Sequence, residues 1–342
     1  MKKVYAYLAG GSLILSSIFI SQGCSKSTED SDDLVGNWKK SSDFDGNARS
    51  EAVTFTIGDS VYLATGTTDR DRFKDLWVYS LSRQYWSQRA DLPGAARNSA
   101  VGFTLGNKGY VGTGYDGTNK LKDFWEYDPA ANTWTQKDDF SGTSRYDAVG
   151  FSVNNKGYLS CGFDGNYLKD LWQFDPSAAS ANQWIQKASI GGSKRSAAQV
   201  FVLSDKAYIC SGNNNGSSLN DLWMYDAATD TWSEKRKISN VSDDDYDDDY
   251  SISRSNGVAF IMGNYAYITS GENGSLLSAT WQYDPSTDLW EQKTGFEGSV
   301  RVGAAAFTLN NRGFVLTGRS GSLSYDNMYE FEPSAEQDDD DN

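Results

Sequence analysis

Apolar and aromatic positions gather in short runs from about residue 34 onward, and Gly, Asn, Asp and Pro separate the runs. These four residue types favour turns and interrupt strands. Within residues 97–134 the runs lie at roughly 99–105, 108–114, 123–128 and 133–137. This stretch therefore predicts four short β-strands joined by tight connections.

The same order of residues recurs six times at nearly constant spacing. Each unit opens with an Arg, has a Gly seventeen residues later, and reaches an aromatic residue ten or eleven positions after that. The arginines are Arg49, Arg97, Arg145, Arg195, Arg254 and Arg301. The glycines are Gly66, Gly114, Gly162, Gly212, Gly271 and Gly318. A period near fifty residues with this punctuation is typical of a propeller or a solenoid.

The position of the tryptophans predicts how the array closes. The first five units end in a second Trp, whereas the sixth has none after Pro333. Trp38 lies eleven residues before Arg49, and four of the five closing tryptophans lie eleven residues before the next Arg. Residues 34–40 should therefore form the outer strand of the last unit, which closes a ring and leaves no open sheet edge at the seam.

The units are similar to kelch repeats, in which a glycine pair ends the second strand and a spaced Tyr and Trp follow. The resemblance covers about residues 34–333. The chain keeps the second glycine of each pair and replaces the first by Thr65, Thr113, Cys161, Ser211, Ser270 and Thr317. The resemblance implies an all-β, six-bladed β-propeller of kelch type in one domain, 34–335, with the ring closed by an N-terminal strand in the last blade.

The beginning of the chain predicts export. Lys2 and Lys3 precede an apolar stretch that ends shortly before Cys24, which is typical of a signal peptide over residues 1–23. A Cys directly after a small residue resembles a bacterial lipoprotein signal and implies lipidation of Cys24. The alternative is an ordinary cleaved signal peptide in which Cys24 is incidental.

Residues 24–33 are polar and acidic, and this composition predicts a disordered tether. An acidic run just after the Cys resembles the surface-export signal of Bacteroidota lipoproteins. We therefore expect a monomer at the outer membrane, exposed at the cell surface and touching the membrane only through its lipid anchor.

Two acidic segments depart from the repeat, an insertion at 239–251 and a tail at 336–342. Charge runs of this kind are usually solvated, and we expect the tail to be disordered. The aspartates at 243–249 invite a calcium interpretation. They lack the turn-forming Gly and the ligand spacing of a calcium loop, so we expect no metal there.

The net charge and the absence of histidine exclude several classes of function. The 342 residues carry a formal charge of −15, which disfavours nucleic acid as a partner because phosphate binding needs clustered Lys and Arg. The chain contains no histidine, which excludes imidazole metal sites and His-based catalysis. Kelch relatives include copper oxidases such as galactose oxidase, whose site needs histidine ligands, so that chemistry is not expected here. We expect no cofactor, and buried thiols rather than a disulfide at Cys161 and Cys210.

The meander places the start of each first strand and the end of each second strand at one end of the propeller. In kelch proteins this end is a common partner-binding face, and the resemblance implies the same here. The six repeating arginines should lie at this end together with polar and aromatic loop residues. The loop candidates are Tyr115, Asp116, Tyr146, Asp147, Phe163, Asp164, Tyr167, Glu272 and Arg319.

Six neighbouring cations need compensation, because adjacent charges about 8 Å apart repel by roughly 2 kcal/mol. An Asp precedes the third-strand Trp in units one to four, at Asp75, Asp123, Asp170 and Asp221. We expect these carboxylates to pair with the arginines. Units five and six carry Ala279 and Asn327 instead. Arg254 and Arg301 would then form an anion pocket or pair with the acidic insertion.

Three functions remain open from the residues. The leading one is a non-catalytic binding module for a glycan or a protein, since aromatic faces beside Asp, Asn and Arg suit both. The second is a sugar-acid-processing, epimerase-like enzyme that uses Arg and a carboxylate such as Asp147 or Glu272. The third is a structural role in an outer-membrane complex. The alternative to all three is that these loop residues simply pack on one another.

Overall fold

The computed structural model describes residue 1, residues 34–338 and residue 340. The predicted signal peptide, Cys24, the tether and part of the acidic tail lie outside the described residues. Within the described part of the chain, no helix is long and apolar enough to span a membrane.

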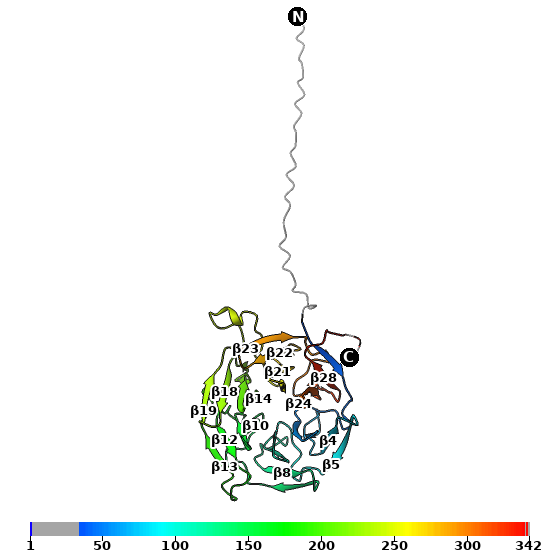
Figure 1. Ribbon diagram of the computed structural model, residues 1–342, viewed down its shortest axis with the longest axis vertical. Coiled ribbons are helices and arrows are strands. Elements are labelled where there is room, and N and C mark those ends of the chain that lie inside the picture. Colours follow the sequence, from blue (N-terminus) through cyan, green and yellow to red (C-terminus); the bar gives the residue numbers. More distant parts are fainter. Residues whose placement is uncertain (2–33, 339, 341–342) are drawn as a thin grey trace. The chain divides into compact units, whose positions relative to one another are not determined.

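Six four-stranded antiparallel sheets are arranged around a central axis, so the predicted six-bladed propeller is confirmed (Figure 1). The first blade contains β2 (Val53–Ile57), β3 (Ser60–Ala64), β4 (Leu76–Ser80) and β5 (Tyr85–Arg89). The second contains β6 (Val101–Leu105), β7 (Lys108–Gly112), β8 (Phe124–Asp128) and β9 (Thr133–Gln136). The third contains β10 (Val149–Val153), β11 (Lys156–Ser160), β12 (Leu171–Phe174) and β13 (Trp184–Lys187).

The other three blades follow the same plan. The fourth contains β14 (Gln199–Leu203), β15 (Lys206–Cys210), β18 (Leu222–Asp226) and β19 (Thr231–Glu234). The fifth contains β20 (Val258–Met262), β21 (Tyr265–Thr269), β22 (Thr280–Asp284) and β23 (Leu289–Lys293). The sixth contains β24 (Ala305–Leu309), β25 (Arg312–Leu316), β28 (Met328–Glu332) and β1 (Asn37–Lys40).

Two short hairpins extend the loops that follow second strands. They are β16 (Asn213–Asn214) with β17 (Ser217–Ser218), and β26 (Arg319–Ser320) with β27 (Leu323–Ser324). The acidic insertion contains one 3-10 turn, η2 (Asp245–Asp247), and projects from the rim of the propeller in Figure 1. Ser239 and Ser251 form a β-bridge that closes its base.

Aromatic side chains fill the spaces between blades, and small residues make room for them. Phe55 stacks on Tyr62 of its own blade at a centroid distance of 5.2 Å. Its ring also lies against Gly109 of the next blade, where an added Cβ would come within 2.1 Å of it. Because no Cβ fits at that distance, glycine is required for the blades to pack this closely. Cys161 and Cys210 are buried free thiols, as predicted.

The seam lies where the sequence predicts it. Strand β1 pairs antiparallel with β28, and Trp38 lies opposite Phe331. The Trp38 ring is completely buried, with ring centroids 4.7 Å from Phe331 and 4.9 Å from Phe296. The outer strand of the last blade therefore comes from the start of the propeller, and its Trp attaches the two ends of the ring.

We predict that Trp38→Ala lowers the free energy of unfolding by about 3–5 kcal/mol, because it removes a fully buried aromatic side chain and leaves a cavity at the seam. Urea unfolding followed by circular dichroism measures the loss. Trp232→Ala is the matched control, since Trp232 lies on the outer strand of blade four, away from the seam, and is only partly buried. Its replacement should lower the free energy of unfolding by less. An unchanged urea midpoint for Trp38→Ala would contradict the role of this strand.

Candidate functional site

Each repeating arginine is the centre of a buried hydrogen-bond network, which blade two illustrates. Arg97 donates from Nη1 and Nη2 to the two carboxylate oxygens of Asp123, at 2.6 Å each. Its Nη1 also donates to the Thr113 carbonyl at 3.0 Å. The Trp125 indole donates to the same carboxylate at 2.7 Å. Bidentate pairs of this kind are among the strongest side-chain contacts and fix the geometry of both partners.

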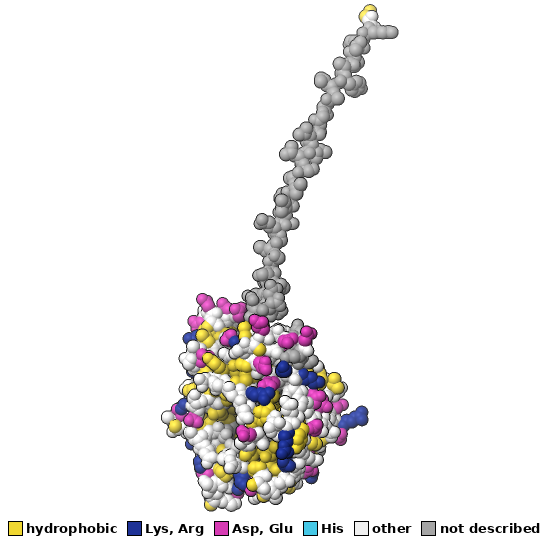
Figure 2. Space-filling view, turned by 45° about the vertical axis from the view of Figure 1, so that its right-hand side comes forward, with side chains coloured by type: hydrophobic (Ala, Val, Ile, Leu, Met, Phe, Trp, Pro, Cys, Tyr) yellow, Lys and Arg dark blue, Asp and Glu magenta, His cyan; other side chains and the backbone are white. Residues whose placement is uncertain are grey.

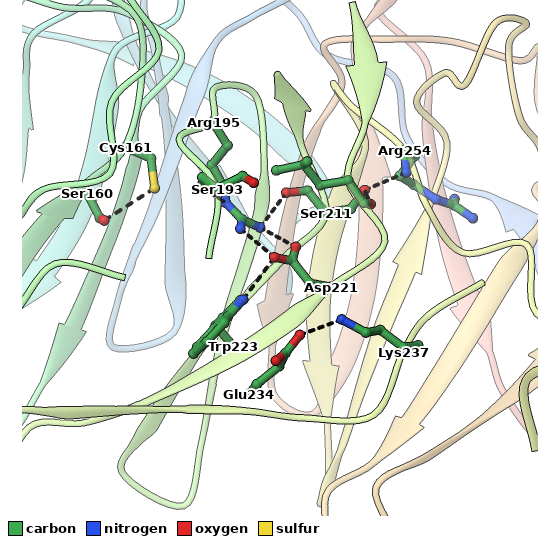
Figure 3. A network of polar contacts seen from close by, with 11 residues as sticks. Ser160, Cys161, Ser193, Arg195, Ser211, Asp221, Trp223, Glu234, Lys237 and Arg254 are labelled. Atoms are coloured by element: carbon green, nitrogen blue, oxygen red, sulfur yellow. Dashed lines mark hydrogen bonds and ion pairs between the residues drawn. The ribbon is translucent and has the colours of Figure 1, made fainter. Parts of the chain in front are cut away.

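The arrangement recurs in the other three blades that carry the Asp. The pairs are Arg49–Asp75, Arg145–Asp170 and Arg195–Asp221. Figure 3 shows the last of these: Arg195 and the Trp223 indole both donate to the Asp221 carboxylate, and Arg195 also donates to the Ser211 carbonyl. The predicted pairing of the four aspartates with their arginines is thereby confirmed.

The main chain of each arginine also joins neighbouring blades. The Gly66 amide donates to the Arg97 carbonyl of the next blade at 2.8 Å, and the Gly318 amide of the last blade donates to Arg49 of the first, also at 2.8 Å. At five of the six blade junctions the glycine amide donates to the arginine carbonyl of the next blade, and at the sixth the Gly318 amide joins the last blade to the first in the same way. Thr65, at the position of the missing kelch glycine, has φ 66°. Its carbonyl accepts from Arg49 at 2.9 Å, so this strained residue serves the network.

Burial corrects one expectation from the sequence. All six repeating arginines are at most 1% exposed, so a partner at the surface cannot touch their guanidinium groups. The preceding loop covers them closely, since a Cβ on Gly94 would lie 2.5 Å from Arg97 Nη2. The arginines therefore do not form a binding ring at the face. They belong to the framework that holds the face in place.

The Arg97–Asp123 pair of blade two shows the sign of the electrostatic contribution. Burial acts to raise the pKa of Asp123, but the Arg97 hydrogen bonds and charge and the Trp125 N–H outweigh it and leave the pKa below its ordinary value. A carboxyl with a lowered folded-state pKa stabilises the fold above the unfolded-state pKa, near 4. That contribution is lost as the pH falls through the lowered folded-state value.

The main chain two residues after each arginine forms a second ring, at the mouth of the central channel. Glu51, the member in the first blade, donates its amide to the Gly303 carbonyl of the sixth blade at 2.6 Å, and each other member donates to the member in the preceding blade. Every member has φ between 51° and 60°. The members are Glu51, Ser99, Asp147, Ala197, Asn256 and Gly303. Their identities differ while their backbones match, so this ring presents six different groups around a pocket of about 160 Å³.

An aromatic groove adjoins the ring on the side of blades three to five. Tyr146, Phe163 and Tyr167 line it with Asp147 and Glu272 in a pocket of about 220 Å³. Ring centroids are 5.7 Å apart for Tyr146 and Phe163 and 5.1 Å apart for Phe163 and Tyr167. The structure thus brings five of the predicted loop residues together. Their rings pack on one another and also face the pocket.

Asp147 is the carboxyl that the channel mouth and the aromatic groove share. Burial raises its pKa most, the Ser99 hydroxyl lowers it and the Glu51 charge raises it, and together they bring the pKa to about 7. Its charge therefore changes near neutral pH, in the middle of the face.

A pocket lined by two arginines, Arg72 and Arg319, and two carboxylates, Glu51 and Asp69, lies on the opposite side of the mouth, with a volume of about 310 Å³. Arg319 Nη2 lies 3.6 Å from a Glu51 oxygen. Arg72 donates to Asn98 at 2.7 Å, and its guanidinium carbon lies 5.1 Å from the Tyr115 ring centroid. Sequence reasoning identified Arg319 and Tyr115 but missed Arg72, Glu51, Asn98 and Asn256. The constant offset of two residues from each arginine was the signal that could have found Glu51 and Asn256.

The remaining acidic candidates hold their own turns. Asp116 accepts from the amides of Thr118 and Asn119 at 2.8 and 2.6 Å, and these backbone bonds lower its pKa. Asp164 accepts in the same way from the amide of Asn166 at 2.9 Å. Across the described ranges, no three Cys, Asp or Glu side chains gather closely enough to hold a metal ion. Acidic and basic side chains are interspersed over the surface visible in Figure 2.

A family model described as the KLHDC2/KLHL20/DRC7 Kelch-repeats domain matches residues 138–318, which is just over half of the chain. The match runs from the end of the second blade into the sixth. No curated protein matches the chain.

We predict that Asp123→Ala lowers the free energy of unfolding by about 3–5 kcal/mol, because it leaves the buried Arg97 cation without its counter-charge. Chemical denaturation at pH 7 measures the loss. The double variant Arg97→Met with Asp123→Leu removes both charges and should lose less than Asp123→Ala alone. A larger loss in the double variant would show that the unpaired cation is not the cause.

Proposed function

The chain belongs to the kelch-repeat family of β-propellers, and we propose that it is a non-catalytic binding module that holds a protein partner at the channel mouth. Kelch propellers are commonly protein-binding modules. The single observation that carries the proposal is the aromatic groove of Tyr146, Phe163 and Tyr167 beside the acidic pair Asp147 and Glu272. Tyrosines in a pocket are typical anchors of protein interfaces.

The charges of this groove favour a cationic side chain of the partner. Asp147 and Glu272 line the groove, and no Lys or Arg is among its lining residues. Glu51 stands across the ring and interacts with Arg319. A Lys or Arg of an extended segment would meet carboxylates in the groove, while the aromatic rings would contact its apolar neighbours. An acidic segment would meet repulsion there and would have to bind on the Arg72 side.

The same proposal includes a location. The pattern of Lys2, Lys3, the apolar stretch and Cys24 supports an exported lipoprotein, and the acidic residues 24–33 support display at the cell surface in the manner of Bacteroidota lipoproteins. A lipid on Cys24 would anchor the chain at the outer membrane, with residues 24–33 as the tether. The propeller would then capture its partner as a monomer outside the membrane.

A glycan is the second candidate ligand, and the row of aromatic rings favours it. Tyr115 and Tyr146 lie 5.5 Å apart between ring centroids, which extends the groove toward blade two. Aromatic faces with nearby amide and carboxylate oxygens suit sugar rings and their hydroxyls. The groove is more acidic than a neutral sugar needs, so we place the protein partner first.

We predict that a random-peptide display library selected on the purified protein enriches segments with Lys or Arg next to an aromatic or aliphatic residue. Phe163→Ala and Glu272→Gln should each weaken the best peptide at least about tenfold, as expected for interface anchors. Tyr265→Ala is the matched control, because Tyr265 is an exposed tyrosine at the opposite end of the blades. Enrichment of no peptide, together with signals on a glycan array, would replace the protein partner by a glycan.

We predict that the affinity for such a cationic peptide rises about tenfold from pH 6 to pH 8, because Asp147 loses its proton across a pKa of about 7 and only its charged form attracts the cation. Isothermal titration calorimetry at the two pH values measures the change. Asp147→Asn should bind equally weakly at both. Equal affinity of the unaltered protein at pH 6 and pH 8 would remove Asp147 from the contact.

A further inference from the structure

Blade five contains a buried arginine that lacks the counter-charge of its counterparts. Arg254 is 0% exposed, and among the described residues its guanidinium donates only to main-chain carbonyls, those of Ile252, Ser270 and Ala279 at 2.9, 2.9 and 3.0 Å. Its Nη2 has no hydrogen-bond partner among the described residues. Arg254 lies at the position that Arg145 occupies in blade three, where the same nitrogen donates to Asp170 at 2.8 Å.

The Trp281 indole N–H is a second donor without a partner in the described part of the chain, and Trp281 occupies the strand position at which the other blades have a tryptophan bound to the Asp carboxylate. In blade three the Trp172 indole donates to Asp170, two residues earlier, at 2.8 Å. Trp281 also stands two residues after the equivalent position, which is Ala279. It is 2% exposed, and its indole N–H has no partner among the described residues. Compared with the Asp of blades one to four, Ala279 lacks the one carbon and two oxygens to which both donors are bound there.

Among the described residues, no hydrogen-bond partner of the Arg254 guanidinium supplies the missing charge. The acidic insertion ends shortly before Arg254 in the chain, but its buried carboxylate, Asp247, accepts from Ser242 and Val241 of its own loop. Cys210 is a neutral thiol at ordinary pH, since burial raises its pKa to about 12. The expectation that Arg254 pairs with the acidic insertion is therefore wrong. Burial lowers the pKa of Arg254 to about 10, so that the guanidinium still carries its proton at neutral pH.

Blade six also carries an arginine without a carboxylate, Arg301, and serves as an internal comparison. Its Nη2 likewise has no hydrogen-bond partner among the described residues, but its surroundings differ from those of Arg254. Asn327 stands where the Asp is missing, and its amide oxygen accepts from Arg301 Nη1 at 2.7 Å. The Arg301 guanidinium carbon also lies 4.9 Å from the Phe296 ring centroid and 4.4 Å from that of Tyr325. Rings at this distance stabilise a desolvated cation. In the described part of the chain, no ring stands in such contact with Arg254.

We propose that blade five holds a small monovalent anion, of the size of chloride or formate, between Arg254 Nη2 and the Trp281 indole N–H, in place of the missing aspartate carboxylate. An uncompensated buried cation costs several kcal/mol, whereas a bound anion restores the charge pair of the other blades. A water molecule would accept the hydrogen bonds but would leave the charge unbalanced. The missing group is a single carboxylate, and protein interiors leave little space beyond the group that is lost, so the site suits chloride or formate and not a larger anion. The anion would support the Ile252 turn at the base of the acidic insertion, since Arg254 Nε donates to Ile252.

Thermal melting in different sodium salts at constant ionic strength tests the proposal. The melting temperature should rise by roughly 3–6 °C as chloride replaces gluconate from about 1 to about 100 mM. Formate should act like chloride, because it has the size and geometry of the missing carboxylate. Ala279→Asp should melt higher than the unaltered protein in gluconate and should show no chloride dependence.

Asn327→Asp is the matched control, because it adds the same charge beside Arg301 and should leave the chloride dependence intact. Chloride-35 NMR gives a second readout that does not depend on melting. The chloride line should broaden in the presence of the unaltered protein and should be narrower in the presence of Ala279→Asp. Equal melting temperatures in chloride, formate and gluconate, or a chloride dependence that survives in Ala279→Asp, would overturn the proposal.

Discussion

The structure depends on a buried arginine that each blade contributes once. Its guanidinium ties the first, second and third strands of its own blade together, and its carbonyl accepts the glycine amide of the preceding blade. One residue thereby fixes both the inside of a blade and the junction to its neighbour. A buried cation is costly unless it is paired, so the position demands a carboxylate or a substitute, and it constrains the residues around it. Gly94 illustrates this constraint, since only a residue without a Cβ lets the loop pass over Arg97.

The same framework explains why the channel mouth is free to vary. The residues two positions after the arginines are held by main-chain hydrogen bonds around the whole ring, and all adopt a left-handed backbone conformation. Their side chains take no part in those bonds. Glutamate, serine, aspartate, alanine, asparagine and glycine can therefore occupy equivalent places without disturbing the ring. The side chains at the channel mouth can therefore differ from blade to blade, because the buried arginine networks beneath them hold the fold together.

The fold could be predicted from the sequence because the constant spacing of the repeated residues determines the number and order of the blades. The constant distance from Arg to Gly predicted six blades, and the distance from Trp38 to Arg49 predicted the seam. The repeated Asp before the third-strand Trp predicted four ion pairs. Full burial of the arginines could not be predicted, since it results from loops that fold back over them in space. Glu51 and Asn256 were missed for a related reason, because their ring is held together by main-chain bonds, which leave no residue preference in the chain.

Sequence differences among the blades have different consequences at the channel mouth and in the buried arginine networks. A change at the channel mouth, such as Asp147 in place of Ala197, alters what the face can bind and leaves the framework intact. A change in the buried arginine network, such as Ala279 in place of an aspartate, leaves a buried arginine without its counter-charge, and the cost of burying that charge has to be offset locally. Blade six offsets part of it with Asn327 and aromatic rings from its own sequence, although one Arg301 nitrogen has no partner among the described residues. No such groups surround Arg254 in the part of the chain that the structure describes, so in our proposal a bound anion supplies the compensation. A repeat protein can in this way acquire a ligand site by losing a side chain.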